Sequence, residues 1–118
     1  MNATLEQLTH RVLQFRDQRD WKQFHSPKEL AVNLCIESAE LLQLMQWRAG
    51  EELDKHLAER REALADELAD VLHSVLLLAH DQRIDLADAF ERKMRKNEQK
   101  YPVHKAKGSA RKYTDLSD

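Results

Sequence analysis

Apolar side chains recur every three or four residues along most of the chain, which is the spacing of amphipathic helices. The first such segment opens at Thr4, and Gln7 three residues later completes a capping box. Its apolar positions are Leu5, Leu8, Val12 and Phe15. The pattern fades over residues 16–20, and residues 21–25 are expected to form a short connector.

The second helix has the clearest start, because Ser26 can cap it and Pro27 suits its first turn. This helix is expected to run to about Trp47 and to stop before Gly50. Apolar residues occupy most of its circumference: Leu30, Ala31, Leu34, Cys35, Ile36, Ala39, Leu41, Leu42, Leu44 and Met45. A helix that is apolar nearly all round is a central one, which predicts that its own domain and another subunit cover it.

Two further long helices and a tail follow. Residues 51–57 can form a short helical turn, and a third long helix is expected from about residue 59 to residue 80. Asp85 is expected to cap a fourth helix, which ends near Tyr101 because the next residue is a proline. Residues 103–118 show no periodicity and are expected to be irregular.

Composition narrows the fold class and the compartment. The chain has 118 residues, enough for one domain, and only two glycines and two prolines, which argues against a many-stranded β fold. Its 19 basic and 21 acidic side chains give no chain-wide attraction to nucleic acid or to a membrane surface. No apolar run approaches the roughly 20 residues of a membrane span, and residues 1–11 lack a signal-peptide pattern. The single cysteine, Cys35, is expected to be a buried core thiol, so we expect an all-α, cytoplasmic protein.

Four carboxylates lie where an apolar core is expected. At about 100° per residue, Glu37 falls in the middle of the apolar arc of the second helix and Glu40 on its edge. Glu67 and Asp70 flank the apolar stripe of the third helix. Each pair shares a helix face, and the 26 residues between Glu40 and Glu67 allow an antiparallel return.

These carboxylates need compensation, because an isolated carboxylate on an apolar face is costly and four converging ones repel each other. A divalent cation would both compensate the buried charge and remove the repulsion between the carboxylates. An all-oxygen ligand set suits Mg²⁺ or Mn²⁺. One alternative is a pair of solvated helix faces with ion pairs to Lys55, Arg60 or Arg61. Another is a di-iron bundle, which expects Glu-x-x-His pairs; the sequence offers only Asp70-x-x-His73.

The fourth helix carries polar side chains where its apolar stripe should continue. Leu86 and Phe90 begin the stripe. Its continuation at helical spacing is Lys93, Asn97 and Tyr101. Lys93 can meet a phosphate, and Asn97 can bind a base edge or a sugar. The alternative is an ordinary helix end that reaches solvent.

Two tryptophans and one histidine are candidates to line a pocket. Trp21 and Trp47 stand at loop or helix ends, where they can act as hydrophobic plugs or as stacking faces. His25, between Phe24 and the start of the second helix, is the histidine best placed to line a pocket.

Five segments in order resemble a known family. Glu37-x-x-Glu40 followed by Glu67-x-x-Asp70 resembles the signature of the MazG-like all-α nucleoside triphosphate pyrophosphohydrolases. The resemblance to their dCTP pyrophosphatase branch rests on Arg19-Asp20-Trp21-x-x-Phe24-His25-x-Pro27, Glu37-x-x-Glu40-Leu41 with Trp47, Glu67-Leu-x-Asp70-Val71-Leu72, Lys93-x-x-x-Asn97-x-x-x-Tyr101-Pro102, and residues 108–116. It spans nearly the whole chain.

The resemblance implies a four-helix bundle that assembles as a homo-oligomer, with a tetramer expected. Residues 1–104 would form the enzyme domain and residues 105–118 a basic tail. The residues implied to bind Mg²⁺, with Mn²⁺ as the alternative, are Glu37, Glu40, Glu67 and Asp70. Those implied to line the nucleobase pocket are Trp21, His25, Trp47 and Asn97. Lys93 and Tyr101 would face the phosphates or the sugar.

The implied reaction converts a nucleoside triphosphate, dCTP or a modified dCTP, to the monophosphate and pyrophosphate. Glu37, in the most apolar surroundings, is expected also to take the proton of the attacking water. Ser74 stands where the family often has tyrosine, which leaves dUTP or another noncanonical nucleotide as an alternative substrate. A non-enzymatic helical dimerisation module is the other class to be tested. Neither a nucleic acid nor a membrane is an expected partner.

Overall fold

The computed structural model describes residues 1–116 and shows helices and turns, with no strand among them. The expected all-helical class is therefore confirmed. The chain divides into two compact units, Met1–Ile84 (unit 1) and a second that begins at Asp85 (unit 2), and each is described by itself. The four-helix bundle and the division into residues 1–104 and 105–118 stay predictions. None of the described helices is long and apolar enough to span a bilayer.

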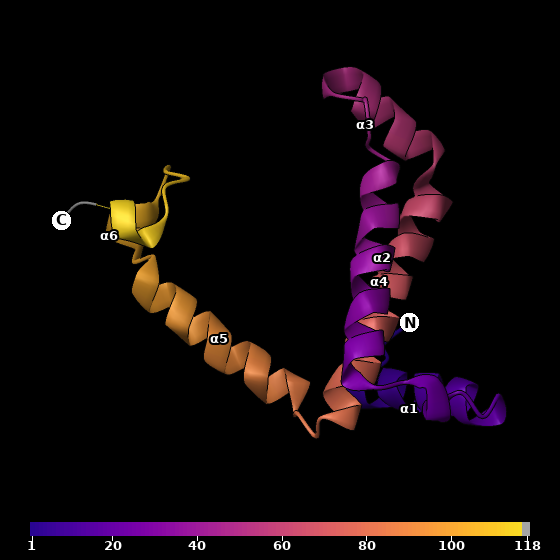
Figure 1. Ribbon diagram of the computed structural model, residues 1–118. Helices are drawn as coiled ribbons and strands as arrows, with labels where there is room; N and C mark the ends of the chain where they lie inside the picture. Colours follow the sequence, from indigo (N-terminus) through magenta and orange to yellow (C-terminus); the bar gives the residue numbers. More distant parts are fainter. Residues whose placement is uncertain (117–118) are drawn as a thin grey trace. The chain divides into compact units, whose positions relative to one another are not determined.

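Unit 1 is built around one antiparallel helix pair. Its elements are α1 (Leu5–Gln18), the 3-10 turn η1 (Lys22–Phe24), α2 (Pro27–Gln43), α3 (Gly50–Glu59) and α4 (Arg61–Asp81). The helices α2 and α4 run side by side in opposite directions, and both α1 and α3 contact α4 (Figure 1). The middle of α2 therefore faces the first half of α4.

The helices begin where side chains can satisfy their free N–H groups. The Thr4 hydroxyl accepts from the Gln7 N–H at 3.1 Å, and the Thr4 N–H donates to the Gln7 side chain at 2.9 Å. The Ser26 hydroxyl accepts from the Glu29 N–H at 3.1 Å. The Asp85 carboxylate accepts from the N–H three residues on, also at 3.1 Å. All three predicted helix starts are confirmed.

Two predicted boundaries are wrong. The second helix ends at Gln43 and not near Trp47, because the chain turns there and Trp47 takes a φ of 66°, which a right-handed helix cannot contain. The expected short turn over residues 51–57 is a full helix of ten residues, α3.

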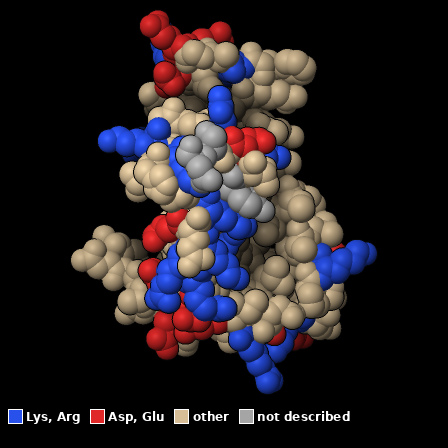
Figure 2. Space-filling model, turned by 90° about the vertical axis from the view of Figure 1, so that its left-hand side faces the viewer, with Lys and Arg blue, Asp and Glu red and all other residues tan. Residues whose placement is uncertain are grey.

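Unit 2 contains α5 (Leu86–Lys100), the short helix α6 (Val103–Ala106) and the 3-10 turn η2 (Tyr113–Asp115). The expectation of an irregular stretch after residue 102 is wrong for α6 and η2. Pro102 ends α5 and also caps α6, because a fixed φ near −60° suits a helix entry. Residues 92–112 hold nine Lys or Arg side chains and one acidic residue, Glu98. Figure 2 shows Lys and Arg side chains gathered over this unit.

The core of unit 1 is small and centres on α4. The buried apolar side chains are Leu30, Leu76, Leu77 and Ala79. Cys35 is exposed, so the expected buried thiol is wrong. Val32, Ile36 and Leu42 are also exposed, because within unit 1 only one side of α2 packs against α4. The apolar circumference of α2 is thus only partly covered by its own unit.

A buried ion pair joins the end of α1 to the end of α4. Arg16 is 2% exposed, and its two terminal nitrogens donate to the two Asp81 oxygens at 2.7 and 2.9 Å. This hydrogen-bonded guanidinium lowers the pKa of Asp81 below its ordinary value of 3.8, although burial opposes the shift. Nothing in the helical pattern predicts the contact, since Arg16 begins the stretch where the periodicity fades.

Candidate metal centre

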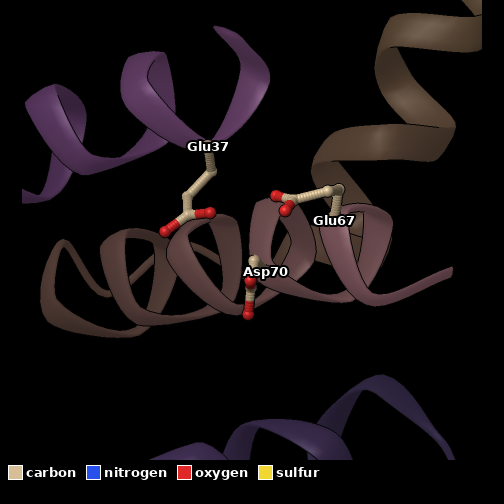
Figure 3. Close-up of side chains that lie close together, drawn as sticks. All are labelled: Glu37, Glu67 and Asp70. Carbon is tan, nitrogen blue, oxygen red and sulfur yellow. The ribbon is translucent and has the colours of Figure 1, made fainter. Parts of the chain in front are cut away.

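Three carboxylates from α2 and α4 meet in unit 1. Glu37 projects from α2, and Glu67 and Asp70 project from α4. One oxygen from each lies within 4.8 Å of the other two. In Figure 3 the Glu37 and Glu67 side chains point toward each other, with Asp70 one turn further along α4. The antiparallel packing of the two helices thus brings together three of the four carboxylates predicted as metal ligands.

Glu40, the fourth predicted ligand, lies beside this group, and its carboxyl group interacts with both Glu37 and Glu67. Burial raises the pKa of both Glu37 and Glu67 above the usual 4.5, and the charge of Glu40 and hydrogen bonding with its carboxyl group raise both further. The charge of Asp70 adds to the shift at both residues. Four acidic groups therefore share one small region without a compensating cation from the described side chains around them.

The donor set fits a divalent cation. The Oε2 atoms of Glu37 and Glu67 are buried and have no hydrogen-bond partner within the described residues. A buried acceptor without a partner is costly, and a raised carboxylate pKa shows that the charged form is under-compensated. Hard carboxylate oxygens are the ligands that Mg²⁺ and Mn²⁺ prefer. Glu37, Glu67 and Asp70 could hold such an ion, with the Glu40 carboxyl group beside them.

A second cluster forms where α1 ends, around Trp21. The Phe15 and Trp21 rings meet edge to face at 5.6 Å between centroids, and the Phe15 and His73 rings do so at 5.9 Å. The Arg19 guanidinium lies 3.8 Å from the centroid of the Phe15 ring. Trp21 remains 43% exposed, so part of its ring is available to a ligand. From the sequence pattern, Phe15 is predicted only to be an apolar position of the first helix. Its contacts with Trp21, His73 and Arg19 could not be predicted from that pattern.

His25, the other candidate in this region, is half-buried. Its Nδ1 atom is buried and lacks a hydrogen-bond partner in the described part of the chain. Burial, followed by the positive charge of Arg16, lowers the pKa of His25 below its usual 6.5, while Asp81 opposes the shift. His25 is therefore uncharged at neutral pH and can donate or accept a hydrogen bond through its ring.

Trp47 does not join Trp21 within one copy of unit 1. Trp21 precedes the start of α2 and Trp47 follows its end, and 17 helical residues span about 25 Å. Trp47 is 90% exposed. A single base cannot contact both indoles of one copy, so the expectation of one pocket lined by both fails within a single unit 1.

The remaining candidates lie on α5, in unit 2. Lys93, Asn97 and Tyr101 follow one another at intervals of four residues, which places them on one side of the helix. Asn97 is half-buried, and the other two are exposed. Their roles toward the carboxylates of unit 1 stay predictions. Ser74, the departure from the family pattern, is buried at 7% exposure, so a tyrosine at this position of α4 would require repacking.

Unit 2 also contains a cavity of about 570 Å³. It is lined by Lys105, Gly108, Ser109, Ala110, Arg111 and Leu116. None of the predicted site residues belongs to this lining.

Comparisons with known proteins agree with the sequence pattern and the fold. The MazG-like family matches residues 32–116. The chain is 44% identical over 115 residues to dCTP pyrophosphatase 1 of Bos taurus and 43% identical to that of Homo sapiens; each alignment covers 96% of this chain and 68% of the relative. The crystal structure of a pyrophosphatase from Archaeoglobus fulgidus is similar with a TM-score of 0.80 and 42% identity, covering 86% of this chain and 95% of that one. The chain belongs to the MazG-like family, and the predicted resemblance is confirmed.

Proposed function

We propose that this chain hydrolyses dCTP or a modified dCTP to the monophosphate and pyrophosphate, with Mg²⁺ held by Glu37, Glu40, Glu67 and Asp70. The observation that carries the proposal is the convergence of Glu37, Glu67 and Asp70, including two buried oxygens without hydrogen-bond partners in the described part of the chain. A purely structural role does not explain why α2 and α4 bring like charges together at their contact.

The comparisons show the enzyme class, whereas the substrate is part of the proposal. The chain is a nucleoside triphosphate pyrophosphohydrolase, as predicted, because it matches curated pyrophosphatases of this kind over nearly its whole length. This class excludes the alternative of a non-enzymatic dimerisation module. The choice of dCTP over dUTP or another noncanonical nucleotide is supported by the names of the relatives and remains part of the proposal.

The acidic cluster has a clear task in this reaction. Cleavage of a triphosphate depends on positioning and on neutralising charge rather than on covalent help from the protein. A bound divalent cation supplies that neutralisation and makes a bound water more acidic. Glu37 is proposed to accept the proton of the attacking water, because the burial and like charges that raise its pKa make it a stronger base than a solvated glutamate.

The base-binding side of the proposal begins at Trp21, whose exposed ring offers a stacking face. His25 stands four residues further on and can hydrogen-bond to a base or a sugar. Trp47 is proposed to complete the pocket from a second copy, because it lies at the far end of α2. Asn97 is proposed to bind the base edge, and Lys93 and Tyr101 the phosphates or the sugar.

We expect the chain to form a homo-oligomer, a tetramer by the resemblance, at micromolar concentration. The exposed apolar side chains of α2 and the separation of Trp21 from Trp47 both favour a second copy against this helix. Light scattering should give a mass at least twice the 13.9 kDa of the chain. A well-folded, fully active monomer would contradict the expectation.

Asn97→Ala is expected to lower the preference for dCTP over dTTP, because an amide can pair with the amine and carbonyl edge of cytosine. Lys93→Ala should instead weaken all triphosphates alike, since a phosphate contact carries no base information. The measurement is kcat/KM for both nucleotides in both variants. An unchanged dCTP-to-dTTP ratio in Asn97→Ala rules out the base-reading role.

A substrate panel tests the whole proposal. Pyrophosphate release is measured with dCTP, 5-methyl-dCTP, dUTP, dTTP and dITP, each with Mg²⁺ and with EDTA. The expected result is metal-dependent hydrolysis with a cytosine nucleotide as the best substrate. A clear preference for dUTP would support the second candidate substrate, and activity that survives EDTA would overturn the metal assignment.

A further inference from the structure

We propose that the buried Arg16–Asp81 ion pair is a positioning device that holds the Trp21–His25 segment in register with the helix that carries Glu67 and Asp70. Arg16 and Asp81 touch no nucleotide in this scheme and act through the residues they hold. The inference rests on the proposed function, because it assigns Trp21 and His25 to the base and the carboxylates of α4 to the metal.

The pair is built as a rigid connection. Both terminal nitrogens of Arg16 donate to Asp81, at 2.7 and 2.9 Å, so the planar guanidinium and the carboxylate fix each other's orientation. The Asp81 side chain is 14% exposed, and the Arg16 Nε atom is buried without a hydrogen-bond partner among the described residues. The contact joins α1 to α4 through two residues that are 65 positions apart in the sequence.

Trp21 is attached to this connection through the backbone. The Trp21 N–H donates to the Arg16 carbonyl at 3.1 Å, so the peptide that carries the ion pair also sets the path of the chain into η1. Phe15, the residue before Arg16, packs against the Trp21 ring with 5.6 Å between centroids. It also packs against the ring of His73 on α4, with 5.9 Å between centroids. Trp21 is thus held by two adjacent residues of α1 that each reach α4.

The same pair connects this segment to the metal helix. Asp81 is the last residue of α4, eleven residues beyond Asp70, which corresponds to about 16 Å along the helix. The Arg16 charge also reaches His25, whose pKa it helps to lower. A shift of α1 against α4 would therefore move Trp21 and His25 relative to the carboxylates, and a base held by this segment would no longer fit the position set by the metal site.

Stability alone is a weak reason for burying these charges. Apolar side chains of similar volume in place of a buried ion pair are often neutral or stabilising, because the desolvation cost disappears. Contacts between apolar side chains have no preferred direction, so two such side chains can slide and rotate against each other. A bidentate ion pair fixes both the distance and the orientation of its two groups. We therefore interpret the Arg16–Asp81 ion pair as a contact that fixes the geometry between the end of α1 and the end of α4.

The test compares the combined Arg16→Met and Asp81→Leu variant with wild type in the full chain. The matched control combines Arg92→Met with Asp88→Leu, which removes an exposed Arg–Asp pair on α5. Thermal unfolding, Mg²⁺ binding without nucleotide, and kcat and KM for dCTP and dTTP are measured for each. We expect the buried-pair variant to keep its unfolding temperature and Mg²⁺ affinity. Its KM for dCTP should rise about tenfold and its preference over dTTP should fall by a similar factor, with kcat changed less than about threefold.

Wild-type KM and base preference in a folded buried-pair variant would overturn the inference and leave the proposed function intact. A wild-type enzyme with no dCTP hydrolysis or no base preference would overturn both. If the apolar pair does not fold, Arg16→Lys decides, because lysine keeps the charge and loses the planar fork. A raised KM for dCTP in folded Arg16→Lys supports the positioning role, and an unchanged KM refutes it.

Discussion

Glu37→Gln is expected to abolish nearly all metal-dependent hydrolysis while the protein stays folded. Glutamine keeps the size of the side chain but removes the charge that would hold a cation and accept a proton from water. Loss of residues that merely support metal ligands costs about 10–100-fold, so loss of Glu37 itself should cost at least about a hundredfold in kcat/KM. Pyrophosphate release at saturating Mg²⁺ is the measurement.

The stability of this variant without metal provides an independent check. The pKa of Glu37 is raised by burial and by its acidic neighbours, so its charged form destabilises the metal-free fold at pH 7. Glu37→Gln should therefore unfold at the same or a higher temperature than wild type without metal. Mg²⁺ should stabilise wild type more than the variant.

Glu62→Gln is the matched control, because Glu62 is an exposed carboxylate on α4, the helix that carries Glu67 and Asp70. We expect it to retain activity and Mg²⁺ stabilisation. Full activity in Glu37→Gln would refute the role of Glu37, whatever the control shows.

Arg16→Ala is expected to lower the free energy of unfolding at pH 7 by about 3–5 kcal/mol, because it leaves the Asp81 carboxylate largely buried without its partner. Chemical denaturation measures the change. The deficit should be fully present above Asp81's ordinary pKa of 3.8 and should shrink as pH falls below it. The sign follows because Arg16 lowers the pKa of folded Asp81, so protonation at low pH removes the benefit of the pair.

Arg92→Ala is the control for this experiment. It breaks an Arg–Asp pair of similar length, 2.9 Å, but both side chains are exposed and the partner lies one helical turn away. Solvent screening limits such pairs to about 0.5 kcal/mol. Equal effects of Arg16→Ala and Arg92→Ala would contradict the importance of burial at Arg16.

The acidic centre was largely predictable because its information is local. Periodicity alone places Glu37 within an apolar arc and sets Glu67 and Asp70 one turn apart, and the caps at Thr4, Ser26 and Asp85 fix three helix starts. Each of these signals spans only a few residues, within which helix geometry decides which side chains are neighbours.

Only the tertiary structure showed how the parts of unit 1 meet. The approach of Glu37 on α2 to Glu67 and Asp70 on α4 depends on how the two helices pack, which periodicity does not encode. The separation of Trp21 from Trp47 depends on where α2 starts and stops.

Sequence by itself determined the helical class, the family and the candidate metal ligands, since helix geometry relates residues three or four positions apart. The tertiary structure alone decided the Arg16–Asp81 pair and the central place of Phe15. Those contacts join residues 65 positions apart in the first case and 58 in the second, from Phe15 to His73. A single sequence carries no periodic signal at such separations, because contacts of this kind are set by how whole helices pack and not by the geometry of one helix.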